Sequence, residues 1–324
     1  MAQLTYLEAI REGLRAEMRR DPRVFVLGED IGVYGGAFKI TDGFLDEFGP
    51  WRVIDAPLAE TANVGAGIGA AVMGMRPVVE MQFADFVTDA FTQVVNMAAK
   101  YHWRTRMPLP LVLRMPYGGD IKGGPFHSQC MEAWFAHTPG LKVVAPAFAE
   151  DAKGLLVAAI RDPNPVMYFE HKHLYRFRRE EVPDGDYATP IGRARLIREG
   201  TAPSVISYGW MLHKCLEAAE IAAADGIAAE VLDLRTLAPL DRDAMLGSVR
   251  KTGKALIVHE ASRTGGIGGE IAALIAEEAF DSLDGPVVRL ASEDTPVPHN
   301  TGLEAAFQPT VAEIADAIRR LAAY

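Results

Sequence analysis

Two glutamates have positions in this sequence that would suit chemistry at the edge of a sheet. Glu60 lies in the segment PLAE, shortly after an apolar run at 53–55, and opens a stretch rich in glycine and alanine. Glu29 lies in LGEDIG and follows the apolar run 24–27. Ligands of α/β folds bind beyond the carboxyl ends of parallel strands, so both carboxylates are candidates for a binding site. A structural interpretation stays equally open, because a helix start favours a carboxylate through the helix dipole.

A glycine-rich segment at 116–129, PYGGDIKGGPFHSQ, supplies the third candidate, His127. The segment follows an apolar run at 111–115 and contains too much glycine for a core. We interpret it as a mobile loop that delivers His127 to a site. A lone histidine in a loop is usually just solvated, so the residue by itself leaves both interpretations open.

Several familiar motifs are absent or misplaced. The glycines at 65–70 match the dinucleotide-binding pattern Gly-x-Gly-x-x-Gly/Ala, but they lie inside a helical stretch instead of directly after a strand. Close helix packing explains them better, and the glycines at 265–269 are better explained by a tight turn before a helix. Zinc-site spacing, Gly-x-Ser-x-Gly, a P-loop and Cys-x-x-Cys are all missing.

Apolar runs alternate with helical periodicity along most of the chain, which predicts an α/β fold with mostly parallel sheets flanked by helices. A capping box, Thr5-x-x-Glu8, opens the first helix. The pattern lapses between about 171 and 195, where charge, proline and glycine dominate. We therefore predict two α/β domains at 1–180 and 195–324, joined by a linker at 181–194.

Composition narrows the classes of partner. The 324 residues carry 33 Lys+Arg against 43 Asp+Glu, a formal charge of −10, and 49% are hydrophobic. This excludes a disordered chain and argues against binding to nucleic acid. Two cysteines, Cys130 and Cys215, make no disulfide framework and indicate a reducing compartment. Because no signal peptide or membrane-length apolar segment is visible, we expect a cytoplasmic protein without a membrane partner.

The order of the motifs resembles one family along nearly the whole chain. The segments that carry the resemblance are LGEDIG (27–32), DAPLAETANVGAGIGAA (55–71), RPVVEMQFADF (76–86), HSQCMEAWFAHTPGLKVVAP (127–146), DAKGLLVAAIRDPNPVMYFEHKHLYR (151–176), VLDLRTLAPLD (231–241), IVHEASRTGG (257–266) and DTPVPH (294–299). Together they resemble the β subunit of a thiamine diphosphate-dependent 2-oxo acid dehydrogenase of the pyruvate or branched-chain type. The resemblance implies a pyrimidine-binding domain followed by a transketolase C-terminal-like domain.

The resemblance also implies roles for individual residues. Glu60 matches the glutamate that hydrogen-bonds the aminopyrimidine ring of thiamine diphosphate, and Glu29 is placed to support it. His127 matches the histidine that handles protons near the reacting carbon of the cofactor. The other implied contacts are Leu58, Ala59, Gln82 and Phe86 with the cofactor, and Phe83, Asp85 and His127 with the substrate. The activity implied is decarboxylation of a 2-oxo acid and reductive acylation of a lipoyl group.

Metal ions and partner chains follow from the same resemblance. The family places a monovalent cation such as K⁺ near the segment that contains Asp162 and Asn164, although a simple turn would explain the same residues. The Gly-Asp-Gly segment that holds the cofactor's diphosphate and Mg²⁺ is absent here. This fits the branch in which a separate α subunit holds them. We therefore expect an α2β2 heterotetramer, with interfaces of roughly 2,000 Å² or more, that docks a lipoyl acyltransferase core.

The sequence leaves three alternatives open. A nicotinamide-dependent dehydrogenase would use the glycine motifs, whose position argues against it. A non-catalytic organising subunit would leave Glu60 dispensable. The β subunit of an acetoin-cleaving complex shares most of the motifs. The sequence does not separate pyruvate from branched-chain 2-oxo acids.

Overall fold

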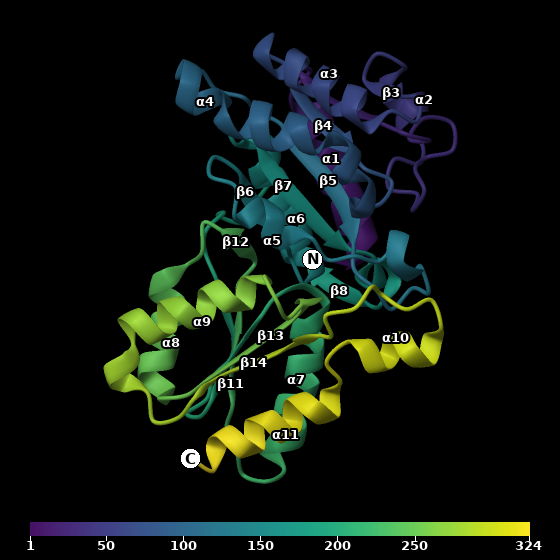
Figure 1. The fold of residues 1–324 in the computed structure, drawn as a ribbon. Coiled ribbons are helices and arrows are strands. Elements are labelled where there is room, and N and C mark those ends of the chain that lie inside the picture. The colour runs from purple at the N-terminus through teal and green to yellow at the C-terminus, as the bar shows by residue number, and fades with distance from the viewer. The chain divides into compact units, whose positions relative to one another are not determined.

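The computed structural model describes residues 1–324 as two compact units. The N-terminal unit comprises Met1–Tyr117 with Trp134–Ile191, and the C-terminal unit comprises Gly118–Ala133 with Gly192–Tyr324. The segment Gly118–Ala133 therefore belongs to the C-terminal unit, although it lies within the span 1–180 in sequence. Each unit is an α/β structure (Figure 1), which confirms the predicted fold class.

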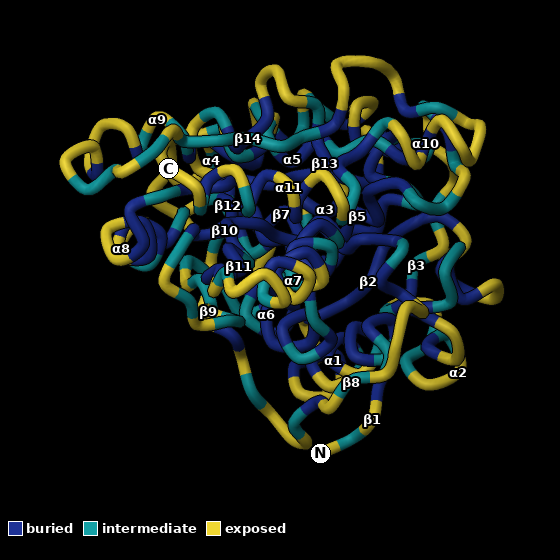
Figure 2. The backbone as a smooth tube through the Cα atoms, turned by 90° about the horizontal axis from the view of Figure 1, so that it is seen from below, coloured by how far each residue is buried: buried dark blue, intermediate teal, exposed yellow.

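The N-terminal unit is built on a parallel sheet with the strand order β6-β7-β5-β4-β2-β3. Its strands are β2 (Val24–Gly28), β3 (Val53–Asp55), β4 (Arg76–Glu80), β5 (Val112–Tyr117), β6 (Lys142–Val144) and β7 (Val166–His171), and its α-helices are α1 (Tyr6–Arg20), α2 (Phe44–Phe48), α3 (Glu60–Val72), α4 (Ala99–Thr105) and α6 (Ala149–Arg161). Figure 2 shows β2, β5 and β7 as buried throughout, as expected for parallel strands covered on both faces.

Short helical segments and a small second sheet complete this unit. The segments are η1 (Ala84–Ala90), the π-helical η2 (Gln93–Ala98) and η4 (Lys172–Arg176). Strands β1 (Ala2–Thr5) and β8 (Arg179–Val182) pair antiparallel, with Ala2 opposite Val182. Neither strand was predicted, because β8 lies in the charged stretch without an apolar run. The predicted capping box is confirmed: Thr5 and Glu8 exchange side-chain and backbone hydrogen bonds at the start of α1.

The C-terminal unit contains a five-stranded sheet with the order β14-β13-β10-β11-β9. The strands of this sheet are β9 (Arg195–Arg198), β10 (Ser204–Ser207), β11 (Glu230–Asp233), β13 (Ala255–Ser262) and β14 (Val287–Ser292). The unit also contains the short strand β12 (Thr236–Ala238), and its helices are α7 (Gly209–Ala223), α8 (Arg242–Thr252), α9 (Ile267–Glu278), η5 (Phe280–Ser282), α10 (Thr301–Phe307) and α11 (Val311–Ala322). All pairs in this sheet are parallel except β9 with β11. In Figure 1, α8 and α9 lie on one side of it and α7 and α11 on the other.

The glycine-rich helix α3 packs closely against the neighbouring sheet. A Cβ atom at Gly67 would lie 2.7 Å from Cγ2 of Val79 in β4, so only glycine permits this approach. A Cβ at Gly69 would meet no atom within 4 Å. Close packing therefore accounts for the central glycine of the motif and not for the last one.

Candidate functional site

The two candidate glutamates lie beyond the carboxyl ends of neighbouring parallel strands. Glu29 directly follows β2, and Glu60 is the first residue of α3, the helix that follows β3. Strand pairing places Gly28, the last residue of β2, opposite both Asp55 of β3 and Glu80 of β4. Both glutamates are buried, with exposed fractions of 6% for Glu29 and 7% for Glu60. The structure therefore brings the two predicted carboxylates to the edge of the sheet where α/β folds bind ligands.

The two carboxylates are electrostatically coupled. Burial raises the pKa of Glu29 above its ordinary value, and the negative charge of Glu60 raises that pKa further. Asn63, one turn into α3, donates a 3.3 Å hydrogen bond to the Pro57 carbonyl and a 3.5 Å bond to Glu29 Oε1. Glu29 Oε2 is buried and has no hydrogen-bond partner in the chain. A buried acceptor without a partner costs about 1–3 kcal/mol, so the site fits a ligand that brings a hydrogen-bond donor.

An aromatic cluster follows β4 and extends the site. Phe83 packs edge-on against Phe38 at 5.4 Å and against Phe86 at 5.8 Å between ring centroids. Asp85 is buried beside them at the start of η1, whereas the half-buried Gln82 donates a 2.7 Å hydrogen bond to Asp30. Such rings suit contact with a flat heterocycle.

The remaining predicted cofactor contacts lie at the start of α3. Leu58 exposes 79% of its surface, and Ala59, the residue before the helix, is half-buried and offers no side-chain cap. An exposed leucine beside two buried carboxylates gives the site an apolar edge. The donor set, with two carboxylates, an apolar edge and aromatic rings, fits an aminopyrimidine that carries hydrogen-bonding nitrogens.

A buried ion-pair triad, which the sequence analysis missed, spans β4, β5 and β7. Arg114 of β5 pairs with Glu80 and, at 2.7 Å, with Glu170, and all three residues are buried. Burial raises the pKa of Glu170 to about 7 despite Arg114, while the two carboxylates raise the pKa of Arg114 above its ordinary value. Glu80 lies two residues before Gln82, so the triad fixes the strand end that leads into the site. Single charges inside the apolar runs at 78–81, 111–117 and 166–171 were the available signal.

His127 belongs to the C-terminal unit, whereas the residues described above belong to the N-terminal unit. It follows the short helical segment η3 (Gly124–Phe126), and its backbone N–H donates to the Gly124 carbonyl at 3.3 Å. Its side chain is half-buried. The structure thus brings together the predicted glutamates and the aromatic residues within one unit, and it places the histidine on a loop of the other unit.

The two residues predicted at a monovalent-cation site form a turn. Asp162 Oδ1 accepts the backbone N–H of Asn164 at 2.9 Å, and its Oδ2 pairs with the Lys142 ammonium at 2.5 Å. Arg76 donates to the Asp162 carbonyl at 3.3 Å. Asn164 Oδ1 is buried without a hydrogen-bond partner. Because Lys142 already neutralises the carboxylate, a cation here would have to rely on other oxygens, and K⁺ binding stays a prediction.

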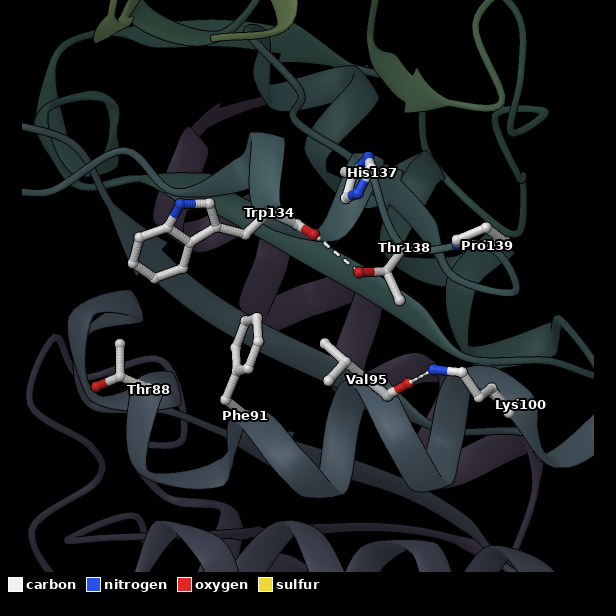
Figure 3. Close-up of a pocket in the computed structure, with 8 residues that line it drawn as sticks. All are labelled: Thr88, Phe91, Val95, Lys100, Trp134, His137, Thr138 and Pro139. Atoms are coloured by element: carbon white, nitrogen blue, oxygen red, sulfur yellow. Dashed lines mark hydrogen bonds between the residues drawn. The ribbon is translucent and has the colours of Figure 1, made fainter. Parts of the chain in front are cut away.

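A pocket of about 660 Å³ opens elsewhere in the N-terminal unit (Figure 3). The residues lining it are Thr88, Phe91, Val95, Lys100, Trp134, His137, Thr138 and Pro139. The rings of Phe91 and Trp134 pack in a T-shaped arrangement with centroids 6.0 Å apart. Lys100 donates a hydrogen bond to the Val95 carbonyl. None of these eight residues was predicted as a site residue.

Two family models and a similar fold identify the chain as a protein of the transketolase class. The family model described as "Transketolase, pyrimidine binding domain" matches residues 2–178, and "Transketolase, C-terminal domain" matches residues 192–314. A solved structure titled "Split gene transketolase, inactive beta4 tetramer" is similar to this chain with a TM-score of 0.80 and 25% identity, covering 99% of this chain and 98% of that one.

Closer relatives narrow the class. The 2-oxoisovalerate dehydrogenase subunit beta of Bacillus subtilis is 48% identical over 100% of both chains. The pyruvate dehydrogenase E1 component subunit beta of Staphylococcus epidermidis is 45% identical over 92% of both chains. The chain therefore belongs to the family of β subunits of 2-oxo acid dehydrogenase E1 components, as the motifs predicted. The nicotinamide-dependent interpretation of the glycine motifs is not supported by any of these relatives.

No helix in the structure combines the length and the apolar character needed to cross a membrane.

Proposed function

We propose that this chain supplies the pyrimidine-binding half of a thiamine diphosphate-dependent active site that decarboxylates a 2-oxo acid. The observation that carries the proposal is the buried pair Glu29 and Glu60 at the carboxyl ends of β2 and β3, one of whose oxygens lacks a partner. When bound, thiamine diphosphate would supply the electron sink that decarboxylation requires.

Within this site Glu60 would accept and return a proton at a ring nitrogen of the aminopyrimidine. Burial keeps water away from the carboxylate, and Glu29, whose pKa burial and Glu60 raise, would hold a proton more readily than an ordinary glutamate. Leu58, Ala59, Gln82 and Phe86 would contact the cofactor, and Phe83 and Asp85 would lie towards the substrate. His127 would handle a proton near the reacting carbon and during acyl transfer to a lipoyl group.

A second chain is required by the missing diphosphate site. The sequence contains no Gly-Asp-Gly segment, and Mg²⁺ prefers oxygen ligands from such a segment and from phosphates. We propose that an α subunit holds Mg²⁺ and the diphosphate in an α2β2 heterotetramer, which then acylates a lipoyl acyltransferase core. Both cysteines are free, and burial raises the pKa of Cys215 to about 12, which suits a protein of the cytoplasm.

The test is dye-coupled decarboxylation with thiamine diphosphate and Mg²⁺. Pyruvate, 2-oxoisovalerate and 2-oxoglutarate are supplied to this chain alone and to the chain co-expressed with an α subunit that carries Gly-Asp-Gly. Activity only in the presence of the α subunit supports the shared site and identifies the substrate. Activity of the chain alone would contradict the shared site, and inactivity in both settings would contradict the proposed reaction.

A further inference from the structure

The loop that carries His127 is held by the C-terminal unit, although it emerges from β5 of the N-terminal unit. Contacts assign the whole segment Gly118–Ala133 to the C-terminal unit. The role of the residues that fix this segment rests on the proposed function of His127.

Two buried carboxylates bind the first amides of the loop. The backbone N–H of Gly119 donates to Glu260 Oε1 at 2.6 Å, and the N–H of Asp120 donates to Glu304 Oε1 at 2.9 Å. Glu260 lies in β13 and Glu304 in α10, and their exposed fractions are 7% and 2%. Hydrogen bonds from an amide to a buried carboxylate are stronger than those between neutral groups. Both acceptors are distant in sequence from the loop, so the contact is purely tertiary.

Glycine at position 119 leaves room for these contacts. A Cβ atom at Gly119 would lie 3.0 Å from Glu304 Oε1 and 3.3 Å from Glu260 Oε1. A side chain at this position would press on both carboxylates, so glycine lets the loop backbone approach them closely.

The side chain of Asp120 adds a second set of bonds. Its Oδ2 accepts the indole N–H of Trp210 at 2.6 Å, and its Oδ1 accepts the Gln308 amide at 2.8 Å. The Lys214 ammonium lies 3.5 Å from Oδ2. Trp210 and Lys214 belong to α7, whereas Gln308 follows α10, so one loop residue joins two helices.

The middle and the far end of the loop are held as well. Gly124 has φ +68°, and a Cβ there would lie 3.0 Å from Nδ1 of His299, which therefore packs against the backbone three residues before His127. At the far end, Tyr208 donates its hydroxyl hydrogen to the buried Glu132 at 2.5 Å. The loop is thus fixed on both sides of His127 by residues of the C-terminal unit.

We propose that Asp120, Glu260 and Glu304 are positioning residues, which hold the loop so that His127 keeps the position that its proposed proton transfer requires. They touch no substrate or cofactor in this account and act through the loop backbone. A purely structural role would lower stability without freeing the loop. A positioning role predicts a freed loop and a slower turnover while the cofactor still binds.

Cleavage by trypsin after Lys122 reports the position of the loop directly, because Lys122 is exposed within it. We compare the assembled α and β subunits with and without Glu304→Ala, and we use Glu304→Gln, which keeps an oxygen for the Asp120 amide, as the conservative variant. Losing a hydrogen bond to a charged group shifts a local opening equilibrium by about tenfold or more. We therefore expect cleavage about tenfold faster and a lower kcat in Glu304→Ala, with an unchanged KM for the cofactor and partial rescue in Glu304→Gln.

Two controls keep the outcome decisive. Glu277→Ala removes an exposed glutamate of α9 and should match the wild type. If Glu304→Ala fails to fold, Trp210→Phe, which removes the indole donor to Asp120 and keeps an aromatic ring at that position, takes its place in both measurements. Unchanged cleavage after Lys122 would overturn the proposal, and so would faster cleavage with an unaltered kcat. If the wild-type assembly lacks decarboxylase activity, the proposed function fails, and the cleavage rates still decide whether these residues hold the loop.

Discussion

The protonation of Glu132 predicts how the stability of this protein depends on pH. Burial raises the pKa of this carboxyl to about 7 from an ordinary 4.5, the hydrogen bond from Tyr208 lowers it in part, and the charge of Glu260 raises it further. The folded protein therefore binds the proton more tightly than the unfolded chain does. The resulting stabilisation is complete below about pH 4.5 and is lost as the pH rises through about 7.

The size of this effect follows from the shift. At about 1.4 kcal/mol per pKa unit, the difference between 4.5 and about 7 corresponds to about 3 kcal/mol of unfolding free energy. The Glu132→Gln variant keeps the shape of the side chain and cannot titrate. Relative to the wild type, we expect it to gain up to about 3 kcal/mol between pH 5 and pH 8.

Urea unfolding followed by tryptophan fluorescence at pH 5, 6, 7 and 8 measures this difference. Glu277→Gln, at an exposed position of α9, serves as the matched control and should follow the wild type at every pH. Parallel stability curves for the wild type and Glu132→Gln would refute the reasoning, because they would show that Glu132 titrates normally in the folded protein.

Two further predictions concern the N-terminal unit. Arg114→Met leaves Glu80 and Glu170 buried without their cation. We therefore expect the variant to lose about 3–5 kcal/mol of unfolding free energy, measured by thermal or urea unfolding. A loss below about 1 kcal/mol would contradict the account of the triad. Gly67→Ala forces a Cβ to within 2.7 Å of Val79 and should cost about 1–3 kcal/mol, whereas Gly69→Ala in the same helix meets no atom and should be neutral or stabilising. Equal effects of the two alanines on the melting temperature would show that α3 does not pack as described.

Alternation of apolar runs and helical stretches was sufficient to predict the fold class, because parallel strands buried on both faces leave a clear signature. Short edge strands leave no such signature. Strand β8 has the sequence Arg-Glu-Glu-Val, and it pairs with β1, which lies about 180 positions away in the sequence. Local signals such as the capping box at Thr5 were reliable because they involve neighbouring residues only.

The candidate site also contains residues that the sequence could predict and residues that it could not. The carboxylates Glu29 and Glu60 could be predicted from their positions after strands, since topology alone brings strand ends together. The hydrogen bonds of Glu260 and Glu304 to the His127 loop could not be predicted, because each joins residues more than 140 positions apart in the sequence. Arg114 was missed because a charge inside an apolar run gives no hint of its two partners.

Replacement of Glu60 tests the central claim most directly. The Glu60→Gln variant is assembled with the α subunit, and its decarboxylation rate and thiamine diphosphate affinity are compared with those of the wild type and of Glu277→Gln. Because positioned acid–base groups contribute about 10²–10⁴ in rate, we predict a loss of at least about 100-fold in kcat with the cofactor still bound. A variant that retains the wild-type rate would contradict the account and would favour a chain that only organises the complex.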